Sequence, residues 1–463
     1  MAGSFRDPAG GVVLGRDRAY RYFLRGFTEE FSRVTDSGLL PSLIDKGMVV
    51  PTAPVPRNGS ALYDIAPDVE LVVEHPRIPF ISYPYEWPFE MLKAAALLHL
   101  DVLEAALAAG FTLKDATPYN VQFMGPDPLI IDVASFEAYQ PGSPWMGYTQ
   151  FCRTFLNPLI LQSALKIPYQ TWLRSSLEGI DPAQLSRLLP LNRKLRKDIF
   201  MDVVLQAWLN RKSAASQKQK PKGAASSPPR PIPKEIIVGM IRRLSRFVAR
   251  MKRPGKNASI WLDYEANAPY EAEALEFKDR FVEAAVSEAA PRVVWDLGCN
   301  TGRYSEIAAR HTQHVVAMDF DEAVVGAVYE RVRERSRNVL PLVIDLMNPS
   351  PSQGWGQSER MGLLERGPAD FAVCLALVHH LAIAGNVPLP RIAEWLGAHV
   401  QSAVVEFVPK NDPMVQTLLR TRPDVFPDYT QAAFEEALKS HFTITSVTQI
   451  PKSERVLFLV AGR

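Results

Sequence analysis

The stretch Val293-Val-Trp-Asp-Leu-Gly-Cys-Asn-Thr-Gly-Arg-Tyr304 decides the fold of the second half of the chain. A short apolar run ends at Asp296 and passes into a loop with glycines at 298 and 302, after which Arg303 opens a helix-compatible segment. This pattern predicts a buried parallel strand, a tight turn and a helix N-terminus whose N–H groups face a ligand. Glycine lets the backbone approach that ligand closely. By itself, the turn fits any α/β nucleotide site.

Two further apolar segments end in acidic residues. His314–Phe320 contains Asp319, 23 residues after Asp296, and Val339–Leu346 contains Asp345. An acid at the tip of the second strand can accept hydrogen bonds from both ribose hydroxyls, as in dinucleotide-binding folds. Asp321 is the alternative, but it starts the next helix and suits an N-cap, so Asp319 is favoured. Asp345 is placed to meet the amino group of an adenine.

The remaining strands predict a sheet of mixed direction. Phe371–Val378 and Ser402–Val408 continue the alternation of strands and helices, and Phe442–Ile450 and Arg455–Ala461 follow with no helix-length gap between them. A parallel partner needs a crossover of a dozen or more residues, so the last two strands must be antiparallel. We therefore expect an α/β fold, a doubly wound Rossmann-like sheet that ends in an antiparallel hairpin.

This conjunction resembles the class I methyltransferases that depend on S-adenosyl-L-methionine (SAM). The D-x-G-x-x-x-G loop is similar to their motif I, and the resemblance covers roughly residues 257–463. It implies SAM as the cofactor, held by Asp296, Gly298, Cys299, Asn300, Gly302, Asp319, Phe320, Asp345 and Leu346. In that family, aromatic residues before motif I shield the sulfonium through cation–π attraction, which here implies Tyr264 and Tyr270, with ordinary packing as the alternative.

Three residues at the carboxyl edge of the predicted sheet are candidates for catalysis. His379 and His380 follow the fourth strand, and Glu406 lies in the fifth. Methyl transfer is an in-line SN2 displacement that needs alignment and a dry pocket more than acid–base help. A histidine here would deprotonate or orient the acceptor. The alternative is that one imidazole ends the strand while the other packs.

The acceptor is expected to be a small molecule. The Asn-Pro-Pro-Tyr type motif that base-amino methyltransferases carry after the fourth strand is absent from this sequence. A nucleic-acid acceptor is therefore disfavoured, while the acceptor atom stays open. Over its whole length the chain resembles nodulation-type bacterial methyltransferases, through the stretches Asn120–Phe123, Ile131–Glu137 and Val405–Pro413.

Length and composition predict two soluble domains. The chain has 463 residues, 47% of them hydrophobic, and a net charge of +2, which argues against a general nucleic-acid surface. Its three cysteines are far apart, so neither a disulfide framework nor a metal site is expected and a reducing cytoplasm fits. An apolar run of 18 or more residues and an N-terminal signal peptide are both absent from the sequence, so no transmembrane segment is expected.

The N-terminal domain, residues 1–210, weakly resembles the C-lobe of protein-kinase-like enzymes. Asp115 and Asn120 have the D-x-x-x-x-N spacing, and Asp132 ends a later strand. The resemblance implies Asp115 as a base and Asn120 with Asp132 as magnesium ligands, in an ATP-binding or phosphate-transferring domain. A glycine-rich loop and the lysine–glutamate pair are missing. The alternative is that Asp115 and Asn120 cap and brace a turn while Asp132 ends a strand. The domain would then be an accessory domain that selects the acceptor.

Residues 211–234 and 235–256 connect the two domains. The first segment is rich in Ser, Ala, Lys and Pro and contains no acid, so a disordered basic linker is expected. The second predicts an amphipathic helix whose apolar stripe alternates with arginines. Docking of that stripe on a domain is favoured, and peripheral membrane contact through residues 235–253 is the alternative. The methyltransferase domain follows at residues 257–463.

Overall fold

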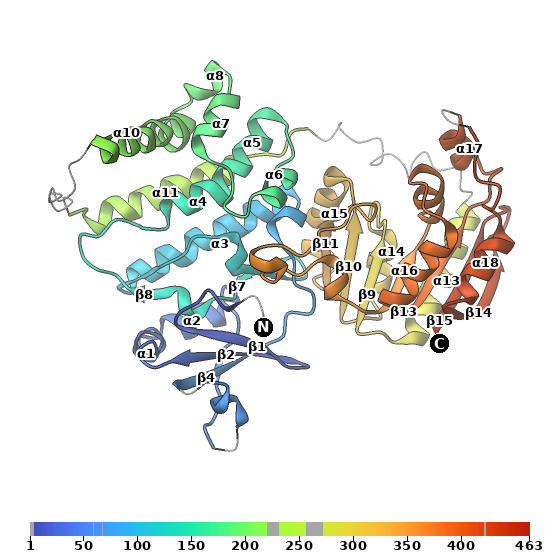
Figure 1. Cartoon of the computed structure of the whole chain (residues 1–463), viewed down its shortest axis with the longest axis horizontal. Coiled ribbons are helices and arrows are strands. Elements are labelled where there is room, and N and C mark those ends of the chain that lie inside the picture. The colour runs from blue at the N-terminus through green and yellow to red at the C-terminus, as the bar shows by residue number, and fades with distance from the viewer. Residues whose placement is uncertain (1–3, 59, 67, 220–230, 256–271, 421–422) are drawn as a thin grey trace. The chain divides into compact units, whose positions relative to one another are not determined.

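The computed structural model describes residues 4–58, 60–66, 68–219, 231–255, 272–420 and 423–463 (Figure 1). The chain divides into two compact units. The first comprises residues 1–78, 82–123 and 128–255, and the second comprises residues 79–81, 124–127 and 256–463.

The second unit contains a seven-stranded sheet in the order β11-β10-β9-β12-β13-β15-β14. Strands β9, β10, β11, β12 and β13 are paired in parallel, while β15 is antiparallel to both β13 and β14. The strands are β9 (Val293–Leu297), β10 (His314–Asp319), β11 (Val339–Val343), β12 (Ala369–Cys374), β13 (Val400–Phe407), β14 (Phe442–Gln449) and β15 (Val456–Gly462). This order confirms the predicted Rossmann-like sheet with its antiparallel hairpin, and it is the order of the class I methyltransferases.

Helices α14 (Arg303–Ala308), α15 (Glu322–Arg335) and α16 (Leu389–His399) lie in the crossovers between parallel strands, which need long connections. Strands β11 and β12 are joined through the short turns η9 (Trp355–Gln357) and η10 (Leu363–Arg366), and the π-helical turn η11 (His380–Ala384) precedes α16. Helix α13 (Ala272–Ala289) precedes β9, and α17 (Pro413–Leu419) and α18 (Gln431–Lys439) lie between β13 and β14. Val286 of α13, Val328 of α15 and Phe371 of β12 belong to one buried core. Burial from the helices explains why the central strands are almost continuously apolar.

Strand register brings the predicted acids to one edge of the sheet. Leu297 at the end of β9 lies beside Met318 of β10, and Met318 lies beside Leu342 of β11. The chain therefore leaves all three strands at the same level, so the segments that carry residues 298–302, 319–321 and 344–347 converge.

The first unit is α+β, as predicted for the N-terminal half. A four-stranded sheet has the order β1-β2-β4-β3, formed by β1 (Gly10–Leu14), β2 (Arg18–Leu24), β3 (Ala53–Pro54) and β4 (Val69–Pro76). Two small strand pairs follow, β5 (Phe111–Leu113) with β8 (Phe136–Ala138) and β6 (Val121–Met124) with β7 (Asp127–Ile130). The kinase-like assignment of this half stays a prediction.

Most of the first unit is helical. Its helices are α1 (Thr28–Asp36), α2 (Leu39–Asp45), α3 (Phe89–Ala108), α4 (Tyr148–Phe151), α5 (Asn157–Leu165), α6 (Gln170–Ser175), α7 (Pro182–Leu188), α8 (Leu191–Lys194), α9 (Lys197–Ile199), α10 (Gln206–Gln219) and α11 (Lys234–Arg250). Short turns are η2 (Ala61–Asp64), η3 (Pro84–Glu86), η4 (Pro118–Asn120) and η5 (Val133–Ser135), and short π-helical segments are η6 (Cys152–Leu156) and η7 (Phe200–Leu205).

The apolar stripe of α11 is docked on the first unit, in agreement with the interpretation that the sequence favours. Ile237, Ile241, Leu244 and Val248 are buried, and α11 packs along α3. Lys93 of α3 donates to the carbonyls at the C-terminal end of α11. The stripe is therefore not available to a membrane surface.

The predicted linker begins later than the sequence indicated. Helix α10 continues to Gln219, eight residues beyond Arg211, where the linker is expected to begin. Alanine, lysine and glutamine are good helix formers, and extending an existing helix costs less than nucleating a new one. Among the helices of the described ranges, none is both long and apolar enough to cross a bilayer.

Candidate functional site

A cavity of about 550 Å³ lies at the carboxyl edge of the seven-stranded sheet. Its size is that of a small-molecule or cofactor site. Nine of the residues predicted from the sequence line it: Asp296, Gly298, Cys299, Asn300, Asp319, Phe320, Asp345, Leu346 and His380.

Asp296 lines this cavity from the C-terminal end of β9. Its carboxylate is buried and accepts a 2.5 Å hydrogen bond from the hydroxyl of Ser305 on α14. Burial raises the pKa of Asp296 to about 7, even though the bond from Ser305 opposes the shift. The carboxylate is thus held at a depth where its charge is costly and where a cationic or hydrogen-bonding ligand would stabilise it.

The turn after β9 is held in left-handed backbone conformations. Gly298 has φ of 75°, Asn300 has φ of 46° and Gly302 has φ of 79°. The backbone N–H of Asn300 donates to a carboxylate oxygen of Asp319 at 2.9 Å, which ties the turn to the tip of β10. The side-chain oxygen of Asn300 is buried and has no hydrogen-bond partner within the described residues. A buried acceptor on a cavity wall indicates a ligand that donates to it.

Gly302 serves the fold and does not line the cavity. It is the N-cap of α14 in the left-handed region, which favours glycine. A Cβ at this position would lie 3.0 Å from a methyl of Val328 and 3.2 Å from the guanidinium of Arg331, both on α15. The sequence predicts close approach of a ligand here, but the structure gives helix packing as the reason for this glycine.

Asp319 and Asp345 present carboxylates from the next two strand ends. Asp319 is buried and accepts hydrogen bonds from the backbone of Asn300 and of Asp321. Burial raises its pKa, and these backbone donors act in the opposite direction. Asp345 is exposed and accepts from the backbone of Met347 at 2.9 Å. A carboxylate has about four acceptor positions, so both residues retain capacity for a ligand.

The two predicted histidines differ in their surroundings. His380 lines the cavity, whereas His379 is fully buried and does not line it, and the ring centroids are 4.2 Å apart. Burial lowers the pKa of His380, and burial together with neighbouring positive charge lowers that of His379 well below 6.5. Both rings are therefore neutral near pH 7. Neither ring nitrogen of His379 has a hydrogen-bond partner within the described residues.

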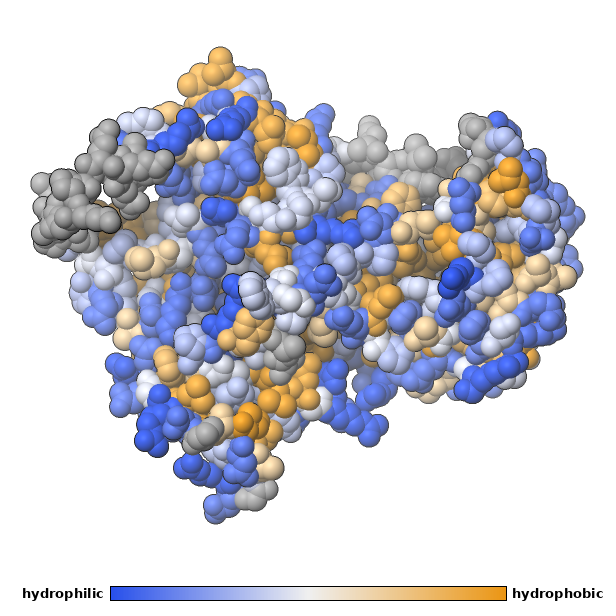
Figure 2. All heavy atoms as spheres, in the orientation of Figure 1, coloured by the Kyte–Doolittle hydropathy of each residue, from blue (hydrophilic) through white to orange (hydrophobic). Residues whose placement is uncertain are grey.

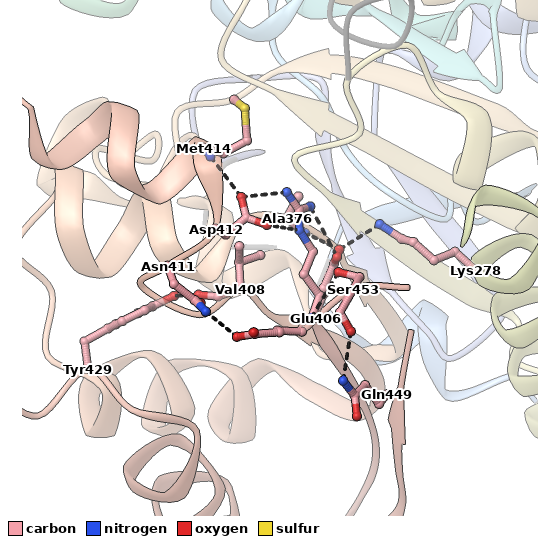
Figure 3. Close-up of polar contacts among 12 residues, drawn as sticks. Lys278, Ala376, Glu406, Val408, Asn411, Asp412, Met414, Tyr429, Gln449 and Ser453 are labelled. Carbon is pink, nitrogen blue, oxygen red and sulfur yellow. Dashed lines mark hydrogen bonds and ion pairs between the residues drawn. The ribbon is translucent and has the colours of Figure 1, made fainter. Parts of the chain in front are cut away.

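Glu406 lies in a buried ion network and not on the cavity wall. Its carboxylate accepts from the ammonium of Lys278 at 2.8 Å and from the backbone N–H of Ala376 at 2.9 Å, as Figure 3 shows. The guanidinium of Arg455 lies 3.5 Å from the other carboxylate oxygen and pairs with Asp412 at 2.6 Å. Burial alone would raise the pKa of Glu406, but Lys278 and Arg455 outweigh it and lower the pKa.

This network fixes the segment that follows β12. Ala376 lines the cavity with φ of 50°, a left-handed conformation that is unfavourable for alanine. The hydrogen bond from its N–H to Glu406 holds that conformation, as surrounding structure must wherever such strain persists. Glu406 therefore shapes the cavity wall through Ala376.

Lys278 was not predicted as a site residue, although the sequence contains a signal for it. It lines the cavity from α13, and its ammonium lies 5.5 Å from the ring centroid of Tyr304. On α13 it follows Ala274 by one helical turn and precedes Val282 by another, so a lysine interrupts the apolar stripe. Lysine is almost never fully buried unless it is paired, so this position predicts a buried acid. Burial lowers the pKa of Lys278, and Glu406 opposes the shift.

The remaining predicted residues lie elsewhere. Tyr264 and Tyr270 fall outside the described residues. The segment Pro409–Pro413, which belongs to a stretch that carries the nodulation-type resemblance, does not line the cavity; within it, Asp412 caps α17 through the backbone of Met414 and pairs with Arg455.

In the first unit, Asn120 donates to Asp132 at 3.2 Å, so these two residues do meet. The other carboxylate oxygen of Asp132 pairs with Arg21 at 2.8 Å, and Arg21 also pairs with Asp7. Asp115 lies nearby, and its pKa is raised by burial and by the charge of Asp132. A guanidinium thus sits where the kinase-like resemblance places a metal. Across the described ranges, no group of three or more His, Cys, Asp or Glu side chains is arranged to hold a metal ion.

A comparison with curated proteins identifies the family. The chain is 38% identical over 459 residues to nodulation protein NoeA of Rhizobium meliloti (strain 1021), which covers 99% of this chain and 95% of that protein. The chain belongs to the NoeA family. The predicted resemblance to nodulation-type proteins is thereby confirmed. No protein-family model matches this NoeA-family chain.

Solved methyltransferases superpose on part of the NoeA-family chain. N-methyltransferase NodS of Bradyrhizobium japonicum WM9 has a TM-score of 0.31 and 11% identity, and covers 42% of this chain and 98% of its own. Magnesium protoporphyrin IX methyltransferase of Synechocystis PCC 6803 with bound SAM has a TM-score of 0.30 and 15% identity, and covers 45% of this chain and 93% of its own. The fold assignment rests on this chain's own strand order.

Proposed function

We propose that the C-terminal unit is an enzyme that transfers the methyl group of SAM to a small-molecule acceptor. The observation that carries the proposal is the convergence of Asp296, Asp319 and Asp345 on one cavity. Three carboxylates at successive strand ends match a donor that carries an ammonium, two ribose hydroxyls and an adenine amino group.

Different residues of the cavity bind different parts of SAM. Asp319 accepts from the ribose hydroxyls, because it is fixed by the backbone of Asn300 and Asp321 and retains acceptor capacity. Asp345 accepts from the adenine amino group. Asp296 and the side-chain oxygen of Asn300 face the amino-acid end, where the ammonium of the donor satisfies the buried acceptor.

Lys278 completes the amino-acid end as the partner of the donor carboxylate. Its ammonium is buried at the cavity wall and is oriented by Glu406. A fixed ammonium needs no reorganisation when an anionic group arrives, so it contributes more than a mobile surface lysine. Arg455 and Asp412 act behind Glu406 and position it.

The bound cofactor supplies an electrophilic methyl group on a sulfonium. The chain's own residues supply alignment and exclusion of water: Leu375, Leu377 and Leu381 line the same cavity with apolar surface. His380 lines the cavity as a neutral imidazole and accepts a proton from the acceptor hydroxyl or amine. His379 packs against it and holds its ring in place.

A small acceptor is favoured by the size of the cavity. A volume of about 550 Å³ lies within the range of roughly 300–1,000 Å³ of small-molecule sites. The apolar residues Met347, Leu381 and Ala384 line the same cavity as His380, so the acceptor presents an apolar surface beside the atom that is methylated.

The test has two stages. Calorimetric titration of the purified chain with SAM and with S-adenosylhomocysteine measures binding of the donor, and we expect saturable binding of both. Incubation of the chain with methyl-labelled SAM and small-molecule extract then identifies the compound that gains label. Absence of donor binding removes the proposal, whereas donor binding with no methylated product in any extract would favour a non-catalytic SAM-binding protein.

Replacement of His380 tests the proton acceptor. We expect His380→Ala to lower kcat by about 10²-fold or more with SAM affinity retained. Since burial lowers the pKa of His380 below 6.5, the native rate should fall only as the pH drops below that value. A rate that His380→Ala leaves unchanged would assign this residue to packing.

A further inference from the structure

We propose that residues 187–212, here called the basic–apolar segment, bind the surface of anionic phospholipid membranes. The segment runs from the end of α7 through α8, α9 and η7 into α10. This inference is independent of methyl transfer, because it concerns only side chains of the first unit.

Large apolar side chains of this segment are exposed to solvent. Leu191 and Leu195, one helical turn apart, are 77% and 78% exposed. Figure 2 shows hydrophobic residues, in orange, at the position of α8 at the top of the view. A concentration of exposed apolar side chains marks an interaction site on a soluble unit. The exposed apolar residues of the segment are Leu188, Leu191, Leu195, Phe200, Met201, Trp208 and Leu209.

The charges of the segment have one sign. It contains seven basic residues, Arg187, Arg193, Lys194, Arg196, Lys197, Arg211 and Lys212, and the acids Asp198 and Asp202. Both acids are paired with Arg243 of α11, which leaves little negative charge to face outward. Within the described part of the chain, the seven basic residues form no ion pair. The sequence from 213 to 234 adds five more basic residues and no acid.

Exposed leucine side chains among basic residues that form no ion pair match an anionic bilayer better than they match a second copy of the chain or a nucleic acid. Leucine side chains enter the acyl boundary while arginine and lysine reach the phosphate headgroups. A second copy of the chain would bring like charges together, which disfavours self-association. Binding of single-stranded nucleic acid relies on aromatic platforms, but five of the seven exposed apolar residues are leucine or methionine.

The structure favours this segment over helix α11, which the sequence offers as the candidate for membrane contact. Helix α11 has the stronger amphipathic pattern, but its apolar stripe is buried against α3. In contrast, the basic–apolar segment buries Leu189, Ile199 and Val203 but keeps seven large apolar side chains exposed to solvent.

Vesicle flotation of the full-length chain tests the inference. Vesicles made from equal parts of phosphatidylcholine and phosphatidylglycerol should carry the protein, whereas pure phosphatidylcholine vesicles should not. Binding to the anionic vesicles should weaken as salt is raised, since screening shortens the reach of the charges. The double variant Arg196→Gln/Lys197→Gln should bind about tenfold more weakly or worse, because each basic residue near such a surface contributes roughly a fivefold factor.

Matched variants separate the segment from general effects. Leu191→Ser/Leu195→Ser should also lose at least about tenfold in binding, while Met146→Ser, which alters a residue that is 75% exposed in the same unit, should not. The charge control is Arg33→Gln/Lys46→Gln, on the exposed surface near α1 and α2. Thermal unfolding confirms that each variant is folded.

Three outcomes overturn the inference: equal binding to neutral and anionic vesicles, no binding to either, or unchanged binding in both segment variants. A dimer that sedimentation detects and that Leu191→Ser/Leu195→Ser dissociates would assign the surface to a second copy instead. Salt-sensitive binding of a single-stranded oligonucleotide without vesicle binding would assign it to nucleic acid.

Discussion

Asp319 is the last residue of β10 and Asp132 lies two residues after β7, but their carboxylates have different partners. Asp319 in the second unit accepts, among the described residues, from the backbone N–H groups of Asn300 and Asp321 and faces a cavity of about 550 Å³. Asp132 in the first unit is bound by Arg21, Asn120 and the backbone of Ala134. An acid that follows a strand therefore predicts a binding site only where other protein groups do not already occupy the hydrogen-bond acceptor positions of its carboxylate.

The largest expected effect concerns Asp319. Replacing it with alanine removes two charge-assisted hydrogen bonds to the ribose, each contributing about 1.5–3 kcal/mol, so SAM affinity should fall at least 100-fold. Calorimetric titration measures the change. Glu334→Gln, an exposed substitution on α15, is the control and should bind SAM normally. An unchanged SAM affinity in Asp319→Ala would show that the ribose hydroxyls of SAM do not bind this carboxylate.

Next in size is the effect of breaking the buried pair of Lys278 and Glu406. Lys278→Met leaves the carboxylate buried with fewer partners, and we expect a loss of about 3–5 kcal/mol in the free energy of unfolding. Arg391→Met breaks the exposed pair with Glu394 and should cost less than about 1 kcal/mol. Urea denaturation compares the two variants.

The double variant Lys278→Met/Glu406→Leu sharpens this test. It removes both buried charges, so much of the stability should return. SAM affinity should stay low, since the ammonium that meets the donor carboxylate is gone. Recovery of both stability and affinity would give Lys278 a purely structural role.

A pH-dependent effect is expected at Asp296. Its pKa rises from 3.8 to about 7 on folding. The raised pKa therefore adds to the free energy of unfolding in full below pH 3.8, and this contribution is lost as the pH rises through 7. Asp296→Asn lacks this loss and should become more stable than the native protein above pH 7, by at most about 4 kcal/mol. Thermal unfolding without cofactor, followed from pH 5 to pH 8, should show the difference growing with pH. A constant difference would contradict the raised pKa.

The smallest effect is expected in the first unit. Asp132→Ala removes a partly exposed ion pair and a cap, and should lower the free energy of unfolding by about 1–2 kcal/mol. SAM affinity should not change. The comparison would fail if the native chain bound ATP with magnesium and Asp132→Ala abolished that binding. Asp132 would then bind a metal ion in place of Arg21.

The sequence by itself determined the class of the second unit and most of its cavity. Apolar runs ending in Asp296, Asp319 and Asp345 predict parallel strands with acids at one edge, because strand direction and period follow from local pattern. The absence of a helix-length gap after Phe442–Ile450 was enough to make the last pair antiparallel.

Only the tertiary structure decided which polar groups remain available. Glu406 and His380 are equally plausible bases in the sequence, but packing pairs Glu406 with Lys278 across 128 residues and leaves His380 on the cavity wall. Packing likewise buries the stripe of α11 and leaves Leu191 and Leu195 exposed. Hydrogen bonding and burial depend on contacts between distant segments, and local sequence periodicity does not encode them.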